Sequence, residues 1–194
     1  MGDDRGPELL AWARREAASR LDVEKFRADR WRHVQAVGAK AERLSSVFGN
    51  EGPLLAASAW LHDIGYAPEL RRSGFHHLDG ALAVERLKGE ARLAALIANH
   101  SGGALEAPLR GLEREMRAYP DEGGPIRDAL WTCDMTTSPT GEPLDFEERL
   151  RDIVDRYDPD HPVPRSILAA AEQIREAIDR TRDRAAAAGI SVDF

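Results

Sequence analysis

The chain has 194 residues, of which 42% are hydrophobic and 31% are charged. This length suits one domain or a domain with small additions, and the apolar content excludes a disordered chain. The net charge of −7, from 27 basic and 34 acidic residues, provides no overall cationic field that would attract DNA or an anionic membrane surface. The single cysteine, Cys133, excludes an internal disulfide and every multi-cysteine metal site.

The longest strongly apolar stretch, residues 54–61, is far too short to span a membrane. The chain does not open with the basic, apolar and small-residue segments of a secretory signal. We therefore expect a soluble, cytoplasmic protein with no membrane partner.

Helical periodicity, interrupted by glycine and proline, predicts helices along most of the chain. The first begins at Pro7, and the third is apolar on nearly all sides, which places it in the middle of a bundle. The predicted helices cover about 7–17, 29–48, 54–62, a segment through Ala81 and Leu87 that ends at Gly89, 90–99, 109–118, 126–134, 145–157 and 166–188.

Strand patterns are scarce, so we predict an all-α fold. The expected organisation is a helical-bundle domain at 22–144, with an N-terminal helix at 1–21 and C-terminal helices at 145–194 packed on it. The amphipathic last helix offers a surface through which two copies of the chain would pair as a homo-oligomer.

Five of the six histidines fall between positions 33 and 100, and a His62-Asp63 pair ends the most apolar helix. Asp134 ends a second apolar helix. Aspartate is seldom buried unless it is paired or bound to a metal, so a divalent cation would explain both aspartates. Imidazole and carboxylate ligands suit manganese, iron, cobalt or zinc, and the carboxylates also suit magnesium. With no cysteine ligands, such a site would be catalytic rather than structural.

The order of His33, then His62-Asp63 in a Trp-Leu-His-Asp-Ile-Gly-Tyr segment, then Asp134 resembles the HD-domain superfamily of metal-dependent phosphohydrolases. The resemblance covers about residues 30–140 and implies an all-helical, HD-type domain. It also implies that these four residues bind one metal ion. The flanking helices carry no recognised motif.

Members of the superfamily with two metal ions have further histidines at positions that His76 and His100 match, and Asp63 would then bridge the ions. His77 stands where many relatives have proline, which favours His76, although a one-residue shift of the helix start would reverse that choice. Alternatively, His76 and His100 bind the phosphate of the substrate. The resemblance therefore implies one or two ions.

The resemblance also implies that a metal-activated water attacks the phosphorus atom. Within this mechanism the catalytic residues would be His62, as a ligand, and Asp63, which binds metal through one oxygen and orients or deprotonates the water through the other.

Because the chain is acidic overall, local cations must neutralise a bound phosphate. Arg30, near the first histidine, and Arg71 and Arg72, in the loop after the His-Asp pair, are candidates. Thr137 lies in the loop that follows Asp134, and its hydroxyl would hold that ligand or contact the substrate. Arginines are also common on solvated surfaces, and threonines are common in loops.

The leading hypothesis is hydrolysis of a phosphate ester in a nucleotide or another small phosphorylated metabolite. One alternative is a diiron HD-type oxygenase, which the two-metal ligand set keeps open. Another is a non-catalytic, metal-containing nucleotide sensor.

Overall fold

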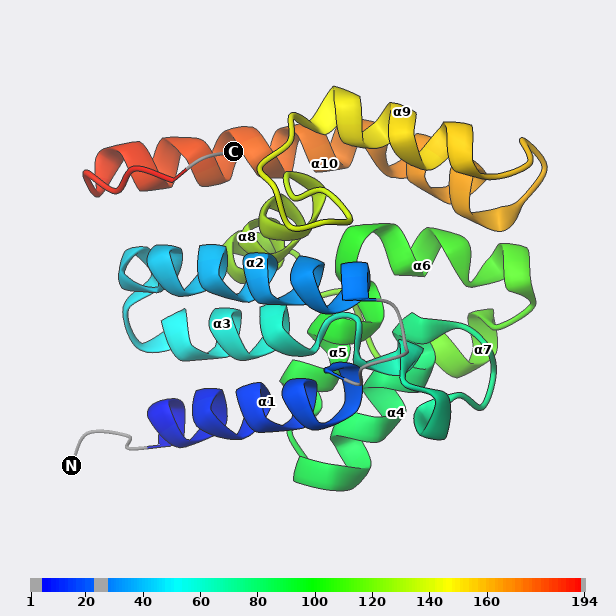
Figure 1. Ribbon diagram of the computed structural model, residues 1–194, viewed down its shortest axis with the longest axis horizontal. Helices are drawn as coiled ribbons and strands as arrows, with labels where there is room; N and C mark the ends of the chain where they lie inside the picture. The colour runs from blue at the N-terminus through cyan, green and yellow to red at the C-terminus, as the bar shows by residue number, and fades with distance from the viewer. Residues whose placement is uncertain (1–4, 23–27, 193–194) are drawn as a thin grey trace.

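A computed structural model describes residues 5–22 and 28–192 (Figure 1). Apart from an isolated bridge between Thr137 and Pro143, this part of the chain contains no β-structure, and the predicted all-α fold is confirmed. None of the described helices is long and apolar enough to cross a bilayer. The α-helices are α1 (Arg5–Leu21), α2 (Ala28–Leu44), α3 (Gly52–Leu61), α4 (His76–Lys88), α5 (Ala91–Asn99), α6 (Gly103–Glu106), α7 (Glu113–Met116), α8 (Gly124–Met135), α9 (Phe146–Arg156) and α10 (Pro162–Ala187).

Helix α3 lies between α1 and α2 and packs against both (Figure 1). Its apolar side chains point in every direction around the helix axis, and most of them are buried. A helix that is apolar on all sides is stable only when neighbours cover it, so this central position follows from its composition, as predicted.

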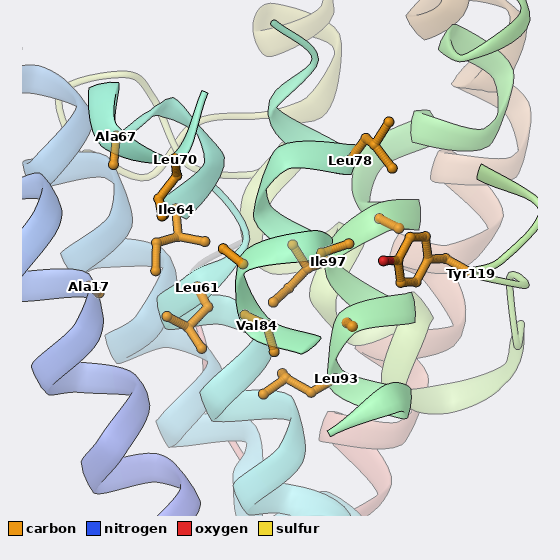
Figure 2. Packing of buried hydrophobic residues seen from close by; sticks show 14 of the residues in the cluster. Ala17, Leu61, Ile64, Ala67, Leu70, Leu78, Val84, Leu93, Ile97 and Tyr119 are labelled. Carbon is orange, nitrogen blue, oxygen red and sulfur yellow. The ribbon is translucent and has the colours of Figure 1, made fainter. Parts of the chain in front are cut away.

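One apolar cluster joins α1, the end of α3, α4 and α5. Figure 2 shows Leu61 of α3 and Ile64 of the following turn beside Val84 of α4 and Ile97 of α5. The turn after α3 comes so close to α4 that a β-carbon on Gly65 would lie 2.0 Å from the carbonyl oxygen of His76. Only glycine fits at this crossing, which holds the end of α3 against the start of α4.

The C-terminal helices α9 and α10 lie side by side, and α10 packs on α8 (Figure 1). Side chains of all three helices form a separate apolar cluster. Trp131 and Met135 of α8 contribute to it, together with Phe146 of α9 and Ile174 of α10. These helices therefore share a core with α8, whose last turn includes Asp134.

Two predicted helices are wrong at their ends. The helix expected at 29–48 stops at Leu44 and continues as a 3₁₀ helix, Ser45–Glu51, that contains Gly49 with a positive φ of 53°. The helix expected at 109–118 is reduced to the four residues of α7, because Gly111 before it adopts a φ of +71° that α-helical residues do not have.

The last helix begins at Pro162, four residues before the predicted start at Ser166. His161 precedes it as the N-cap, and its Nδ1 accepts a hydrogen bond of 3.2 Å from the amide of Val163. Imidazole here plays the part usually taken by serine or aspartate, and propensity alone does not reveal this start.

The substitution Gly65→Ala tests the close approach of the turn to α4. We expect it to lower the free energy of unfolding by about 2–3 kcal/mol or more, because the new methyl group meets backbone atoms that cannot move alone. Gly80→Ala, on the other side of the same crossing, is the milder comparison: its β-carbon would meet Ile97 at 3.0 Å and the backbone nitrogen of Gly65 at 3.3 Å, and the gain in helix propensity offsets this crowding, so the change should stay within about 1 kcal/mol. Urea unfolding measures the free energy of unfolding of both variants, and equal values would contradict the close approach of Gly65 to α4.

Candidate metal centre

Six histidine and aspartate side chains from five helices converge near the middle of the molecule. Five of them stand at or next to a helix end, which brings them together although they are spread over a hundred positions of the sequence. They are His33 of α2, His62 and Asp63 at the end of α3, His76 at the start of α4, His100 directly after α5, and Asp134 near the end of α8. All are buried except His76, which is partly exposed.

His33, His62 and Asp134 form a first group of donor atoms. The Nε2 atom of His33 lies 3.0 Å from Oδ1 of Asp134 and 3.3 Å from Nε2 of His62. The Nε2 atom of His62 lies 3.8 Å from the same Asp134 oxygen. Three atoms that can each donate a lone pair to a cation thus surround one point.

Asp63 connects this group to a second one. Its Oδ2 lies 3.3 Å from Nε2 of His62, while its Oδ1 lies 3.5 Å from Nε2 of His76 and 3.9 Å from Nε2 of His100. The two latter histidines are themselves 3.3 Å apart, Nε2 to Nε2. One oxygen of this carboxylate therefore faces His62 of the first group, and the other faces the pair of His76 and His100.

These separations suit divalent cations. Ligand atoms that are each about 2.1 Å from one ion, at the angles of octahedral or tetrahedral coordination, are roughly 3.0–3.4 Å apart. Most of the separations in both groups fall in or near this range, and imidazole with carboxylate is a donor set typical of transition metals. Both groups fit a divalent ion.

Backbone carbonyls orient three of the histidines. Nδ1 of His33 is 2.9 Å from the carbonyl oxygen of Ser138, Nδ1 of His62 is 2.7 Å from that of Ala59, and Nδ1 of His100 is 2.6 Å from that of Ile97. A carbonyl can only accept, so each Nδ1 carries the proton and donates it. The Nε2 atoms are then the ones available to bind a metal.

Further hydrogen bonds hold Asp134 and the end of α8. The hydroxyl of Ser101 donates to Oδ2 of Asp134. The buried ammonium of Lys40 donates to the carbonyl oxygen of Thr136 at 2.7 Å, where α8 ends. The indole of Trp131 donates to the carbonyl oxygen of Asn99 at 2.9 Å, which ties α8 to the residue before His100.

Ser101 is a residue that the sequence analysis missed. Its φ of 45° places it in the left-handed region, where a residue with a β-carbon is strained. The only sequence signal is its position next to His100, in a Ser-Gly-Gly segment whose composition is typical of a helix end.

Arg30 stands over the centre. Its guanidinium forms an ion pair with Oδ2 of Asp63 and lies 4.2 Å from the centre of the Tyr66 ring. Burial alone would raise the pKa of Asp63, but the charges of Arg30 and His62 outweigh it and hold that pKa well below the ordinary value. Burial likewise raises the pKa of Asp134, but the contact with His33 and the charge of His62 lower it by more, so both carboxylates are ionised at neutral pH.

The histidines differ in their affinity for protons. Burial lowers the pKa of His33 and lowers that of His100 to about 4, so both rings are neutral at physiological pH. Burial also opposes the charged form of His62, but the adjacent Asp63 more than compensates and raises the pKa of His62 to about 9. In the metal-free chain a protonated His62 therefore stands among the donor atoms.

The centre opens into a cavity of about 90 Å³. Cationic side chains of Arg30, Arg149 and Arg156 line it, together with Glu106, whose carboxylate is paired with Arg110. Helices α9 and α10 and the loop between them also contribute Ile153, Tyr157, Val163 and Ile167 to the lining. Of the arginines and apolar residues that line the cavity, the sequence indicated only Arg30.

Three predicted substrate-binding residues lie elsewhere. Arg71 and Arg72 are exposed, and Arg72 lines a separate surface cavity beside Asp79 rather than the one at the centre. Thr137 is buried, and its hydroxyl donates to the carbonyl oxygen of Cys133 at 2.7 Å. The loop after α3 turns away from the centre, and the threonine completes the end of α8.

His77 and Cys133 are both buried, but His77 also lines the cavity and offers a ring nitrogen within 4.8 Å of those of His76 and His100. His77 stacks on His100 with 4.0 Å between ring centres, and its Nδ1 lies toward Gly103 without a hydrogen-bond partner among the described residues. The Nε2 contacts with Asp63 are those of His76. Burial raises the pKa of the Cys133 thiol to about 12, as expected for a core residue rather than a nucleophile.

A family model, that of the HD domain, matches residues 30–160. The chain belongs to the HD-domain family. HD domains bind divalent metals, and the family is one of metal-dependent hydrolases. The buried His62-Asp63 pair agrees with this membership. Comparisons with curated proteins and with solved structures gave no match.

The match to the HD domain continues past the expected resemblance at 30–140 and takes in α9. The organisation expected for this HD domain, with boundaries after residues 21 and 144, stays a prediction.

Two substitutions at Ser101 separate its hydrogen bond from its backbone strain. We expect Ser101→Ala and Ser101→Gly both to weaken manganese binding about tenfold, because Asp134 loses the donor that orients it. The glycine variant should be the more stable of the two by about 1 kcal/mol, since only glycine accepts a positive φ without strain. Manganese titration and urea unfolding measure the two effects, and unchanged affinity in both variants would show that the hydroxyl does not support Asp134.

The raised pKa of His62 predicts a pH dependence of metal binding. Below about pH 9 the metal-free chain carries a proton on His62 that a bound cation must displace, so the affinity should rise with pH, by about tenfold per unit, and level off near pH 9. His33 and His100 contribute no proton at neutral pH, because their pKa values are lowered. Titration calorimetry in buffers of different ionisation enthalpy counts the released protons. An affinity that is constant between pH 6.5 and 8.5 would contradict this assignment.

Proposed function

We propose that this HD domain is a metal-dependent phosphohydrolase that cleaves a phosphate ester of a nucleotide or another small phosphorylated metabolite. The observation that supports it most is the position of Asp63 between two sets of imidazoles, beside Arg30 and at the floor of a small cavity. A substrate phosphate in that cavity would meet both the donor groups and a guanidinium.

Each of the two groups of donor atoms would hold one divalent ion. The first would hold one ion through three buried residues and one oxygen of Asp63, and the second would hold another through the remaining oxygen and two histidines. The proposed ligands are His33, His62, Asp63 and Asp134 for the first ion, and Asp63, His76 and His100 for the second. Manganese, iron, cobalt, zinc and magnesium are all compatible with such donors.

Bound divalent ions would supply Lewis acidity, which lowers the pKa of water and withdraws charge from a phosphoryl oxygen. The residues of the chain supply position and proton transfer. With the first ion alone in place, the free oxygen of Asp63 would orient the attacking water and accept its proton, and His62 would hold the ion beside it. With both ions in place, both oxygens of Asp63 would be ligands, and its part would be to position the ions. Arg30, already against Asp63, would contact a phosphate oxygen.

Among the substrate-binding residues predicted from sequence, we assign this role to Arg30 and not to Arg71, Arg72 or Thr137, because Arg30 alone of these four lines the cavity. A guanidinium with a planar set of donors suits a phosphate better than a single hydroxyl.

Hydrolysis is tested with the full chain loaded with manganese, cobalt or iron and offered a panel of phosphomonoesters, cyclic nucleotides and dinucleoside phosphates. We expect metal-dependent release of phosphate or nucleotide, and a loss of at least about a hundredfold in kcat/KM for Asp63→Asn and His62→Ala, since each removes a ligand and a group at the reacting atoms. Asp155→Asn, an exposed residue of α9, is the matched control and should behave as wild type.

Metal analysis accompanies the assay. Two ions per chain would support both groups, and their reduction to one in His100→Ala would assign His100 to the second. Wild-type protein that holds metal but cleaves no ester would contradict the proposal. Iron with oxygen consumption would then indicate the oxygenase alternative, and thermal stabilisation by a nucleotide without turnover would indicate a sensor.

A further inference from the structure

Helix α9 carries an arginine on its buried face. Phe146, Arg149, Leu150 and Ile153 are its buried residues, at the three- and four-residue spacing of one helix side. The side chain of Arg149 is only 8% exposed, although arginine is almost never buried unless it is paired. Its position therefore calls for a partner.

The partners within the chain are incomplete. One terminal nitrogen of Arg149 donates to Asp152 at 3.1 Å, but that carboxylate is 39% exposed and also forms an ion pair with Arg156. The Nε of Arg149 is buried without a hydrogen-bond partner among the described residues. A buried donor without an acceptor is costly, and the cost is larger when the group is charged.

The cavity at the metal centre is where an acceptor would come from. Arg149 lines it together with Arg30, Asp63 and His76. Arginine binds the oxygens of a phosphate through paired, charge-assisted hydrogen bonds. The cavity, at about 90 Å³, is much smaller than the roughly 300–1,000 Å³ of sites for drug-sized ligands. It has room for a phosphoryl group and for little of a nucleotide.

Apolar groups lie beside the arginines on the side of the cavity that α9 and α10 provide. Ile153, Val163 and Ile167 line it with the ring of Tyr157. They would contact the part of a substrate next to its phosphate, and that part must be compact and present an apolar face to them.

We propose that Arg149 is a substrate-binding residue that holds an oxygen of a terminal phosphate, and that the substrate is the phosphate monoester of a small, compact compound. This inference rests on the proposed hydrolase function and narrows its substrate class. It gives the C-terminal helices a direct part in the site, because α9 contributes Arg149 as a second cation beside Arg30 of α2.

The test measures binding of inorganic phosphate to the manganese-loaded full chain by titration calorimetry. Arg149→Gln should weaken phosphate binding by about tenfold or more, because it removes a charge and a paired donor. Arg149→Lys should recover only part of the affinity, since an ammonium cannot form the paired bonds. Arg151→Gln, an exposed arginine two residues along α9, is the matched control and should bind phosphate as wild type does.

Manganese content and the thermal unfolding midpoint are measured on the same samples. We expect both to stay at wild-type values in Arg149→Gln, because Arg149 is not a proposed ligand, its Nε makes no bond that would be lost, and its bond to the half-exposed Asp152 leaves that carboxylate still paired with Arg156. A variant that loses metal or unfolds together with its phosphate affinity would show a structural role and overturn the inference. So would unchanged phosphate affinity, or a wild type that binds no phosphate.

The outcomes also separate this inference from the hydrolase proposal. If wild type cleaves phosphate esters and Arg149→Gln retains the KM for a small monoester, the assignment of Arg149 is wrong and the hydrolase stands. If phosphate binding depends on Arg149 but no ester is cleaved, the anion site stands and the hydrolase is wrong. A KM that rises in Arg149→Gln for small monoesters but not for nucleotides would support both.

Discussion

The burial of two ionised carboxylates is the constraint on which this structure depends. Asp63 and Asp134 lie among apolar helices, where an unpaired charge would cost several kcal/mol. The fold surrounds them with compensating groups: a guanidinium and two histidines near Asp63, and a histidine and a serine hydroxyl on Asp134. The same arrangement that makes their burial tolerable collects ligand atoms for cations, so the stability of the core and the chemistry of the site have one origin.

Helix ends make this convergence possible. The last carbonyls of a helix lack partners within it, and two histidines of the centre use them in the same way. His62 bonds the carbonyl of Ala59, and His100 bonds that of Ile97, each three residues back in the helix that it ends. Each ring thereby satisfies an otherwise free backbone acceptor, fixes its own tautomer and directs Nε2 away from the helix. One hydrogen bond ends the helix and aims the proposed ligand.

The parts of the site that were predictable from sequence are those with a local signal. His62 and Asp63 stood out because a polar pair ended an apolar helix, and Asp134 did for the same reason. Arg71 and Arg72 were selected for their nearness in sequence, but the chain direction after Gly65, set by its contact with α4, leads them away from the cavity. Ser101 acts on a carboxylate 33 positions away, so nothing local marks it. For Arg149 a signal existed, a charge within an apolar stripe, but its meaning depends on how α9 packs on α10.

The distribution of charge accounts for how an acidic chain would bind an anion. The net charge of −7 is spread over the surface, whereas the cavity gathers Arg30, Arg149 and Arg156 around two carboxylates that cations would neutralise. Exposed charges are screened within about 10 Å at ordinary ionic strength, while charges inside a partly buried cavity are screened much less. The negative surface therefore opposes extended polyanions more than it opposes a small phosphate that enters the cavity whole. Discrimination of this kind follows from where the arginines are held, and α9 holds one of them only because the apolar residues on either side of Arg149 anchor the helix in the cluster that it shares with α10 and α8.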